Sequence, residues 1–491
     1  MPAMLRSYYR SVFTFTLCVF GACNFGTQAS SDLANPAEDM ASPLDSAGAP
    51  DLAGAGSLLL FTVTPRLAPS SGGVKATIFG QGFVAGASLK VEVNGVPATQ
   101  VTVDSPGQLT VTLPALPGVV GAVPVKVTNG NGAAATLLGP ELFTVFLSNV
   151  SYAAATSFAV GVGPRSVVAT DFDGDQKIDL AVACADGNRV GVMLGQGNGS
   201  FGVPKYTTVG TYPFTVASAD FDGNGKPDLV TSNQGSNNVS VLFNYAADLF
   251  GTSKTFAVGS KPQGIALGDV NEDGKPDVVI GNYGSSSYTL LTNQGQTNFG
   301  SATSALTAAP YAMLLEDVTA DTHVDLCSVS DVTGSFYYGQ GNGTGSFVMA
   351  TAVPVGAGPY AAVYTDLNLD GYPEIIAANP AANKLSLQQG QNGTVFSGPT
   401  DIAVGMRPEH LATADLDGDR YPDLVVANYN SNTVTILYGK GDTTFGRIQT
   451  VAVGTNPNWV TIADVNGDKR LDIVAANYKG DSVSVLLNSS Q

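Results

Sequence analysis

The chain has 491 residues, of which 13% are charged and 44% hydrophobic, and it contains 58 glycines and 27 prolines. Its formal net charge of −18 and pI near 4.3 argue against a nucleic-acid partner, because phosphate binding requires a basic surface. Short Val/Ile/Leu runs between clusters of Gly, Asn and Asp dominate the sequence, and no amphipathic helical pattern stands out beyond residue 30. We therefore expect an all-β protein with more than one domain.

Residues 1–23 are predicted to be a signal peptide. Arg6 and Arg10 precede an apolar run at 12–20 that is too short to span a bilayer. Phe20-Gly-Ala-Cys23 resembles the lipobox of bacterial lipoproteins, although that family usually has Leu where this chain has Phe20. The resemblance implies a lipid on Cys23 and a lipoprotein at the outer membrane or cell surface. Without the lipid, the protein would be secreted.

Residues 24–57 are predicted to be a flexible tether. The segment contains no Lys or Arg and is rich in Ala, Ser, Pro, Asp and Gly, a composition that cannot bury a core. We expect contact with a membrane only through the lipid.

Residues 58–147 are predicted to form a compact β-sandwich. Strand-like runs occur at 59–64, 74–79, 89–93, 109–113, 123–128 and 142–146. Pro65, Gly72-Gly73 and the segment Ile78-Phe-Gly-Gln-Gly-Phe83 resemble the IPT/TIG family of immunoglobulin-like domains. The resemblance implies a spacer or adhesion module rather than a catalytic domain.

Residues 151–491 contain one nine-residue loop written seven times. Its first copy is Asp171-Phe-Asp-Gly-Asp-Gln-Lys-Ile-Asp179, and the others open about every 49 residues at Asp220, Asp269, Asp317, Asp366, Asp415 and Asp464. A fixed period of this size indicates a repeat architecture. Oxygen-bearing side chains occupy loop positions 1, 3, 5 and 9.

These loops are predicted to bind calcium, which takes six to eight oxygen ligands. An EF-hand is excluded because position 12 of the first loop is Val182 and strands flank the loop. The simpler alternative is that Asp, Gly and Asn only make tight turns, but a turn does not need the acid that every copy carries at position 9. The fourth loop has Thr319 at position 3 and no Gly, so up to seven ions are expected and the fourth site should be the weakest. The candidate ligands are Asp171, Asp173, Asp175, Asp179, Asp220, Asp222, Asn224, Asp228, Asp269, Asn271, Asp273, Asp277, Asp317, Asp321, Asp325, Asp366, Asn368, Asp370, Glu374, Asp415, Asp417, Asp419, Asp423, Asp464, Asn466, Asp468 and Asp472.

Each repeat also carries four strand-like runs, which is typical of one blade of a β-propeller. A proline lies seven residues before each loop, the second run usually ends in Asn, and a Phe closes a Gly-rich turn before the fourth run. The last copy stops after its third run, and the missing fourth stands before the first repeat as Phe158-Ala-Val-Gly161. This displaced strand predicts a closed ring of seven blades without open edges.

These repeats resemble the FG-GAP (VCBS) repeat family, whose propellers include the heads of integrin α chains. The resemblance covers all seven copies and implies a calcium loop between the first and second strands of each blade. It also implies a binding or adhesion module that acts on an extracellular glycan or protein ligand. We expect the chain to act as a monomer.

An enzyme is not expected. The chain has only two histidines, His323 and His410, in different repeats, and it lacks a Gly-x-Ser-x-Gly nucleophile turn. Cys184 and Cys327 lie in repeats one and four and are predicted to be buried thiols rather than a disulfide. The alternative is a calcium-dependent polysaccharide-degrading enzyme or its non-catalytic targeting subunit, because related propellers occur within such enzymes.

The ligand is predicted to bind on the propeller face opposite the calcium loops, where aromatic and amide side chains gather. The proposed pocket lies in the last two repeats and consists of Trp459, Tyr478, Tyr429, His410, Asn428 and Asn477. Two alternatives remain open at this point. Trp459 could instead pack inward between blades and fix ring closure, and the Asn and Tyr side chains could only cap turns and pack blades.

Overall fold

The computed structural model describes residues 58–490 except 65–66, 117–118, 120, 138–142, 147–149, 246–248, 252 and 393. The predicted signal peptide with Cys23, the tether and Pro65 lie outside the described residues. The chain divides near residue 148 into two compact units, which are described separately. Both units are built from strands, and the described residues contain one short 3-10 helix, η1 (Tyr283–Ser285). No helix among them is long and apolar enough to cross a membrane.

The first unit is a β-sandwich. Its sheets have the strand orders β1-β3-β7-β6, β10-β9-β4-β5 and β2-β11-β8. The strands are β1 (Leu59–Thr64), β2 (Leu67–Pro69), β3 (Lys75–Gln81), β4 (Lys90–Val93), β5 (Val96–Pro97), β6 (Thr99–Ser105), β7 (Gln108–Thr112), β8 (Gly121–Val123), β9 (Val125–Thr128), β10 (Ala134–Leu137) and β11 (Phe143–Phe146). The predicted run at 123–128 is split into β8 and β9 around Pro124, which lacks the N–H that a continuous strand would need.

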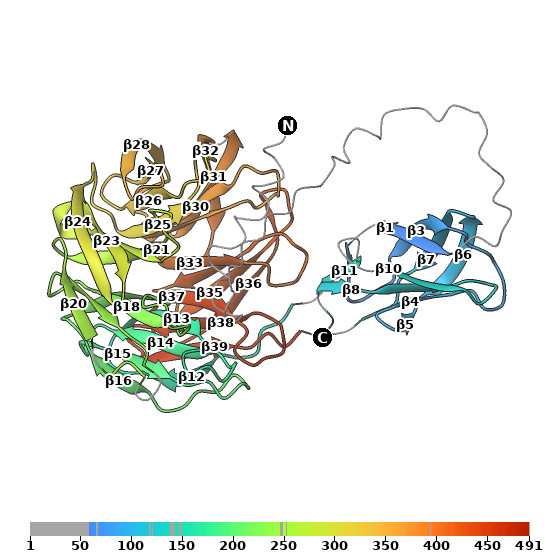
Figure 1. The fold of residues 1–491 in the computed structure, drawn as a ribbon, viewed down its shortest axis with the longest axis horizontal. Helices are drawn as coiled ribbons and strands as arrows, with labels where there is room; N and C mark the ends of the chain where they lie inside the picture. Colours follow the sequence, from blue (N-terminus) through green and yellow to red (C-terminus); the bar gives the residue numbers. More distant parts are fainter. Residues whose placement is uncertain are drawn as a thin grey trace. The chain divides into compact units, whose positions relative to one another are not determined.

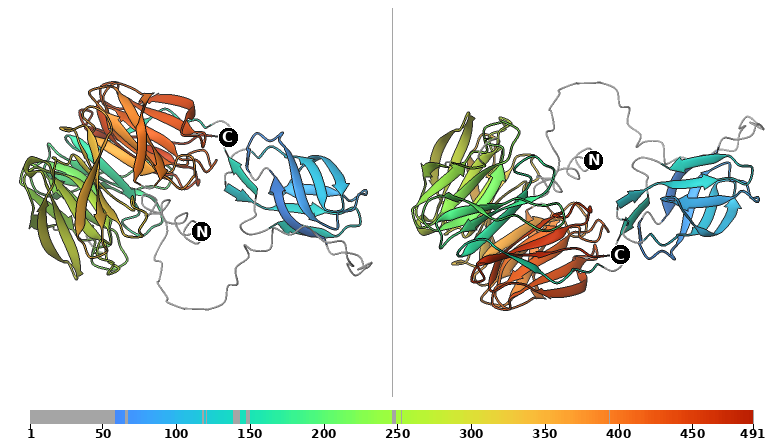
Figure 2. Two further views of the ribbon diagram at one scale, coloured as in Figure 1. Left: turned by 90° about the horizontal axis from the view of Figure 1, so that it is seen from above. Right: turned by 90° about the horizontal axis from the view of Figure 1, so that it is seen from below.

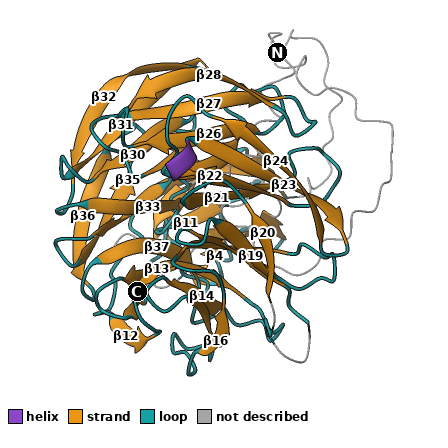
Figure 3. Cartoon of the chain, turned by 90° about the vertical axis from the view of Figure 1, so that its left-hand side faces the viewer, coloured by secondary structure: helices purple, strands orange, loops and turns teal. Residues whose placement is uncertain are grey.

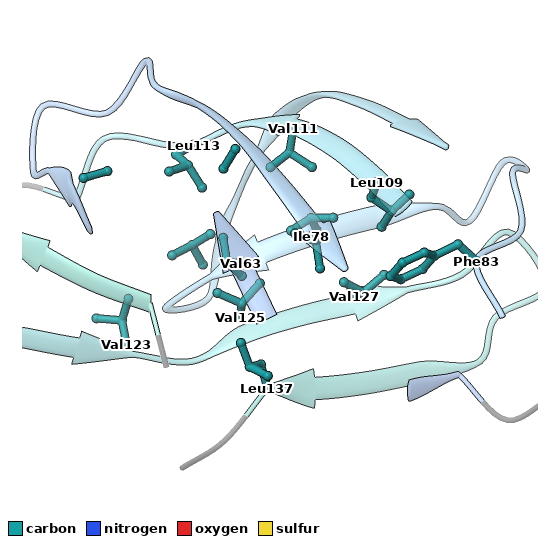
Figure 4. Close-up of a cluster of buried hydrophobic side chains, with 14 of the residues drawn as sticks. Val63, Ile78, Phe83, Leu109, Val111, Leu113, Val123, Val125, Val127 and Leu137 are labelled. Carbon is teal, nitrogen blue, oxygen red and sulfur yellow. The ribbon is translucent and has the colours of Figure 1, made fainter. Parts of the chain in front are cut away.

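Alternating side chains of the two larger sheets fill the core of this unit. Ile78 and Leu109 come from one sheet and Val91 and Val127 from the other, and all four are at most 1% exposed. Figure 4 shows these layers meeting, with Phe83 closing one end. This arrangement confirms the predicted immunoglobulin-like fold class.

The second unit consists of seven four-stranded antiparallel sheets, and it confirms the predicted seven-bladed propeller (Figures 1 and 2). Blades one to three contain β13 (Pro164–Thr170), β14 (Asp179–Cys184), β15 (Arg189–Met193), β16 (Lys205–Thr208); β17 (Pro213–Ala219), β18 (Asp228–Asn233), β19 (Asn238–Leu242), β20 (Ser253–Ala257); and β21 (Pro262–Gly268), β22 (Asp277–Asn282), β23 (Ser287–Gly295), β24 (Asn298–Ala305). Blades four and five contain β25 (Ala312–Glu316), β26 (Asp325–Ser330), β27 (Ser335–Gly341), β28 (Phe347–Pro354); and β29 (Ala361–Thr365), β30 (Glu374–Asn379), β31 (Lys384–Asn392), β32 (Val395–Ala403). Blades six and seven contain β33 (Pro408–Ala414), β34 (Asp423–Asn428), β35 (Thr433–Gly439), β36 (Phe445–Ala452); and β37 (Pro457–Ala463), β38 (Asp472–Asn477), β39 (Ser482–Leu486) with β12 (Thr156–Ala159).

The displaced strand closes the ring as predicted. β12 pairs antiparallel with β39, and Phe158 lies opposite Val483. The first strand of every blade contacts the first strand of the next, and β37 returns to β13. In Figure 3, β13, β21, β33 and β37 lie toward the middle of the ring, while outer strands such as β24, β32 and β36 lie at its rim.

The core lies between blades rather than within them. All residues of each second strand are buried because neighbouring blades cover both of its faces, as in Asp179–Cys184. One apolar cluster joins Phe172 of blade one to Phe250 of blade two, whose rings meet edge to face at 5.4 Å. Cys184 and Cys327 are free and buried, which confirms the prediction for both thiols.

Candidate functional site

In every blade the predicted calcium loop connects the first strand to the second. In blade one, the Asp171 carboxylate accepts hydrogen bonds from the backbone N–H groups of Gly174 (2.7 Å) and Gln176 (2.8 Å). Gly174 adopts φ 83°, the left-handed conformation that lets the loop curl around this carboxylate. The loop backbone thus fixes the carboxylate oxygens before any ligand enters.

The acid at loop position 9 fastens the loop to the rest of the blade. Asp179 is fully buried, and its two oxygens accept N–H groups from Phe172 (2.8 Å) and from Gly195 after the third strand (2.7 Å). Burial raises the pKa of Asp179 to about 6 and that of Asp228 to about 7, because desolvation disfavours the charged form. In each of the six remaining blades, the position-9 side chain likewise accepts a hydrogen bond from a backbone N–H at loop position 2 or 3.

In three blades, carboxylate oxygens from positions 1, 3 and 9 lie within 4.8 Å of one another. The sets are Asp171, Asp173 and Asp179; Asp220, Asp222 and Asp228; and Asp415, Asp417 and Asp423. In blades three, five and seven, position 3 is an amide, Asn271, Asn368 or Asn466. These carboxylate and amide oxygens fit a hard divalent cation such as Ca²⁺.

Two of the position-5 side chains are paired with lysines of their own loops. Asp175 accepts the backbone N–H of Lys177 at 2.9 Å and is also bonded to the Lys177 ammonium. That neighbour lowers the pKa of Asp175. Asp273 has the same arrangement with Lys275 at 3.0 Å. Position 5 is thus paired with a lysine in these two loops.

The fourth loop differs in sequence and hydrogen bonding. Loop positions 4 and 6 are left-handed in every copy, and in the fourth loop neither is glycine, since Ala320 (φ 57°) and Thr322 (φ 80°) occupy them, which adds strain. The Asp321 carboxylate accepts a hydrogen bond from the Gln340 amide at 2.7 Å. Burial raises the pKa of Asp321, but hydrogen bonds from Gln340 and His323 lower it by more, so the net shift is downward. This carboxylate already has donors in its own blade.

The sixth loop is the most enclosed. Desolvation raises the pKa of Asp417 to about 8, and the adjacent carboxylates Asp419 and Asp415 add to the shift. Two or more acids so close together cannot all ionise cheaply without a counter-charge.

Sequence reasoning missed two structural features of the loops. In every loop the position-2 residue is a buried apolar anchor, such as Phe172 or Phe221, each 1% exposed. In blades two, three and seven, an Asn near the end of the third strand donates to the carbonyl of the previous blade's anchor, as Asn244 does to Phe172 (2.7 Å) and Asn293 to Phe221 (2.9 Å). The apolar anchor could have been predicted from the sequence, because position 2 is apolar in all seven copies.

Trp459 does not stand free on the opposite face. It is half-buried and packs against the cluster that joins blade seven to blade one, which includes Val167 and Val465. Its indole stacks on the His410 ring with centroids 3.7 Å apart. Burial lowers the pKa of His410 to about 3, so this imidazole is neutral. The inward-packing account of Trp459 is therefore the one that the geometry favours.

The placement of Asn428 and Asn477 on a ligand face is wrong. Both are fully buried, because their strands are covered on both sides. The Asn477 amide donates to Ser482 (3.2 Å) and Ser484 (2.9 Å) of the third strand. A Cβ on Gly454 would lie 2.5 Å from this amide, and Gly210, Gly259, Gly356 and Gly405 face the equivalent Asn side chains, which explains the Val-Gly before the proline in the blades that carry this Asn. In blade one, Cys184 takes the place of this Asn and donates to the Val160 carbonyl.

Tyr478 and Tyr429 make contacts of a different kind. The Tyr478 hydroxyl lies 3.1 Å from that of Tyr212 and donates to Asp186 at 3.3 Å. The Arg407 guanidinium lies 4.6 Å from the centroid of Tyr429. The six predicted residues therefore divide into a core stack, two buried amides and two tyrosines beside arginines, and they do not form one pocket.

The structure instead brings together the residues that directly follow the seven prolines. These are Arg165, Phe214, Gln263, Tyr311, Tyr360, Glu409 and Asn458. Four of them are in contact across blades: the Arg165 guanidinium lies over Phe214, Phe214 reaches Tyr311 across blade three with ring centroids 6.0 Å apart, and Tyr311 stacks on Tyr360. We call this set the post-proline ring. It lies at the ends of the inner strands farthest from the loops.

Three family models match the chain. The FG-GAP-like repeat matches residues 171–231, 220–280, 317–377, 366–426 and 415–475, the FG-GAP repeat matches 262–303, and the IPT/TIG domain matches 61–145. No curated protein matches the sequence.

Among solved structures, two crystals of BBS1N in complex with ARL6DN resemble the chain. The mercury-soaked crystal has a TM-score of 0.51 at 11% identity, and the lead-soaked crystal has 0.50 at 12%. Each match covers 69% of this chain and 97% of that chain. A protein of unknown function from Bacteroides thetaiotaomicron covers 88% of this chain and 98% of its own, with a TM-score of 0.38 at 12% identity. At these identities the likeness concerns the fold alone.

Proposed function

Since the chain belongs to the FG-GAP-like repeat family and also carries an IPT/TIG domain, we propose that it is an exported, calcium-binding surface protein. Its propeller would bind a glycan or protein ligand through the face opposite the calcium loops. The observation that supports this most directly is the clustering of three carboxylates within 4.8 Å in three separate loops. The carboxylates within such a cluster repel one another when no cation is bound, and a divalent cation removes the repulsion.

Calcium would have a structural role. The position-9 acid connects each loop to the turn after the third strand, as Asp179 does through Phe172 and Gly195. An ion held by the same acid would stiffen that connection in up to seven blades, and most weakly in the fourth. The loops are then positioned at one end of the inner strands, which leaves the other end for a ligand.

Export and anchoring rest on the N-terminal sequence. We propose that residues 1–23 direct export and that Cys23 carries the lipid, with 24–57 as the tether. We also propose that the protein is not an enzyme. The two thiols in the described part of the chain, Cys184 and Cys327, are buried, and burial raises the pKa of Cys184 to about 12, far from a reactive thiolate.

The test is thermal unfolding with calcium and with excess chelator, followed by ligand binding under the same conditions. With dissociation constants on the order of 10⁻⁴–10⁻³ M, typical of extracellular modules, 10 mM calcium should stabilise the protein by about 1.4–2.7 kcal/mol per site. Magnesium at equal ionic strength serves as the control. An unfolding midpoint that chelation leaves unchanged would rule out the calcium sites.

Ligand binding is measured on an array of neutral glycans, acidic glycans and extracellular proteins, with and without calcium. Degradation of the same glycans is measured in parallel. Calcium-dependent binding without degradation is the expected result. Release of shortened glycans would establish the enzyme alternative instead.

A further inference from the structure

The post-proline ring is built by the backbone at the start of each blade. In blades one, two, three, six and seven the strand register shifts just after the proline, which marks a β-bulge. In blades four and five the regular strand begins only after Tyr311 and Tyr360, whose N–H groups donate to Val329 and Ala378. Bulges redirect side chains, and they are frequent beside binding sites. One residue from every blade is thus placed at the same level around the axis.

Arg165 is the cation of this ring. Its guanidinium lies 4.0 Å from the centroid of Phe214 and 5.5 Å from that of Tyr478, and it donates a long hydrogen bond of 3.4 Å to the Tyr212 hydroxyl. Its Nε atom is buried and has no hydrogen-bond acceptor. Among the described residues, no carboxylate forms an ion pair with it, and the nearby Glu409 is paired with Arg407 at 2.7 Å.

Arg165 nevertheless remains charged. Burial disfavours the charged form, but the neighbouring Tyr311, Tyr212 and Glu409 outweigh that cost and raise the pKa of Arg165. The half-buried guanidinium forms no direct ion pair with a carboxylate, and an incoming anion would supply one.

Two amides of the ring also lack partners. Gln263 is 5% exposed and Asn458 is 6% exposed, and the Gln263 Oε1 and Asn458 Oδ1 atoms accept no hydrogen bond. These oxygens come from blades three and seven, on either side of Arg165 around the ring. A buried carbonyl oxygen without a donor costs free energy, and a ligand hydroxyl would satisfy it.

Three further members supply flat apolar faces, and the seventh, Glu409, is a buried carboxylate paired with Arg407. Tyr311 and Tyr360 stack with centroids 4.2 Å apart and planes 12° from parallel, and Phe214 meets Tyr311 edge to face. Aromatic rings of this kind combine apolar area with little loss of side-chain entropy.

We propose that the post-proline ring binds a sugar residue that carries a carboxylate, a uronic acid within an acidic glycan. This inference rests on the proposed binding function and specifies its site and ligand class. Arg165 pairs with the sugar carboxylate, and the oxygens of Gln263 and Asn458 accept its hydroxyl groups. The rings of Tyr311, Tyr360 and Phe214 contact its C–H faces.

A peptide carboxylate fits the same site less well. It would satisfy Arg165, but an aspartate or glutamate side chain brings no hydroxyl donors for Gln263 and Asn458. The chain's net charge of −18 also opposes unspecific binding of a polyanion. Recognition of an acidic glycan must therefore be local.

The probes are short oligomers of glucuronate and galacturonate, together with their methyl esters, which keep the ring and the hydroxyls but lose the charge. Binding is measured by calorimetry on the full chain with calcium. Arg165→Gln should weaken binding of the acids about tenfold or more, the usual effect of losing a charged hydrogen-bonded pair. The affinity of Arg165→Lys for the acids should lie between those of the wild type and Arg165→Gln, because lysine keeps the charge but lacks the planar guanidinium.

Arg189→Gln is the matched control. Arg189 also stacks on a tyrosine, with its guanidinium 3.7 Å from the Tyr206 centroid, and its Nε is buried without an acceptor. It belongs to the third strand of blade one and not to the post-proline ring. Its loss should leave binding of the acids unchanged, and the melting temperature of each variant verifies folding.

Preference for the acids over their esters, lost in Arg165→Gln and kept in Arg189→Gln, would establish the proposal. Equal binding of acids and esters would overturn the proposal. It would also be overturned if a chelator abolished binding of the acids while Arg165→Gln left it unchanged, because calcium would then bridge the protein and the glycan. No binding of any uronate would overturn it as well. If neutral glycans or proteins bind in that case, the proposed function stands, and if nothing binds, both fail.

Discussion

Replacing Trp459 with Ala should destabilise the propeller and leave ligand binding intact. The half-buried indole packs against the cluster between blades seven and one and stacks on His410 at 3.7 Å. Full burial would make Trp→Ala cost about 3–5 kcal/mol, and the stack contributes about 1 kcal/mol of that. Because the side chain keeps some exposure, we expect a loss of about 3 kcal/mol.

The assay is guanidinium unfolding in saturating calcium, with ligand binding measured on the folded variant. Val203→Ala, at a side chain that is 92% exposed, is the control and should change stability by less than about 0.5 kcal/mol. Trp459→Phe should recover part of the loss, because a smaller ring can still stack. The reasoning fails if Trp459→Ala unfolds at the wild-type denaturant concentration while losing ligand binding, since that result would make Trp459 a contact residue.

Three further predictions follow from other parts of the molecule. Asp317→Asn in the fourth loop should lower calcium stoichiometry and stability less than Asp220→Asn in the second, because Gln340 already engages the fourth loop at Asp321; equal losses by calorimetry would contradict this. His410 has a folded pKa lowered to about 3 by burial, so its contribution to stability is lost as pH falls from about 6.5 towards 3, by about 2 kcal/mol at pH 5. His410→Gln should show a smaller loss between pH 7.5 and pH 5 than the wild type, and parallel pH profiles would refute the assignment. Cys23→Ser should move the protein from the membrane fraction to the soluble fraction, whereas a wild-type protein already soluble in the medium would indicate plain secretion.

The period of the loops made the fold predictable, because one proline, one loop and four strand runs recur in every copy. The closing strand was predictable for the same reason, since Phe158 precedes a repeat that does not need it. The burial of the Asn side chains was not predictable. Because Asn is frequent in turns, Asn477 was expected at the surface. The strand that ends with it is covered on both faces, so its amide donates hydrogen bonds to the third strand. The post-proline ring was missed because a bulge, which sequence periodicity does not show, turns Arg165 toward other blades.

Ring closure by β12 has a consequence for how the protein is made. Ser157 and Ser484, which lie opposite each other in β12 and β39, are 327 residues apart in the chain. At about 5–20 residues per second, β12 is synthesised on the order of tens of seconds before its partner exists. During that interval β12 has no partner strand. Once β39 is made, it can pair with β12 of its own chain or with β12 of a neighbouring molecule. Dilute conditions favour the chain's own strand, whereas refolding at high concentration favours exchanged dimers with intact blades.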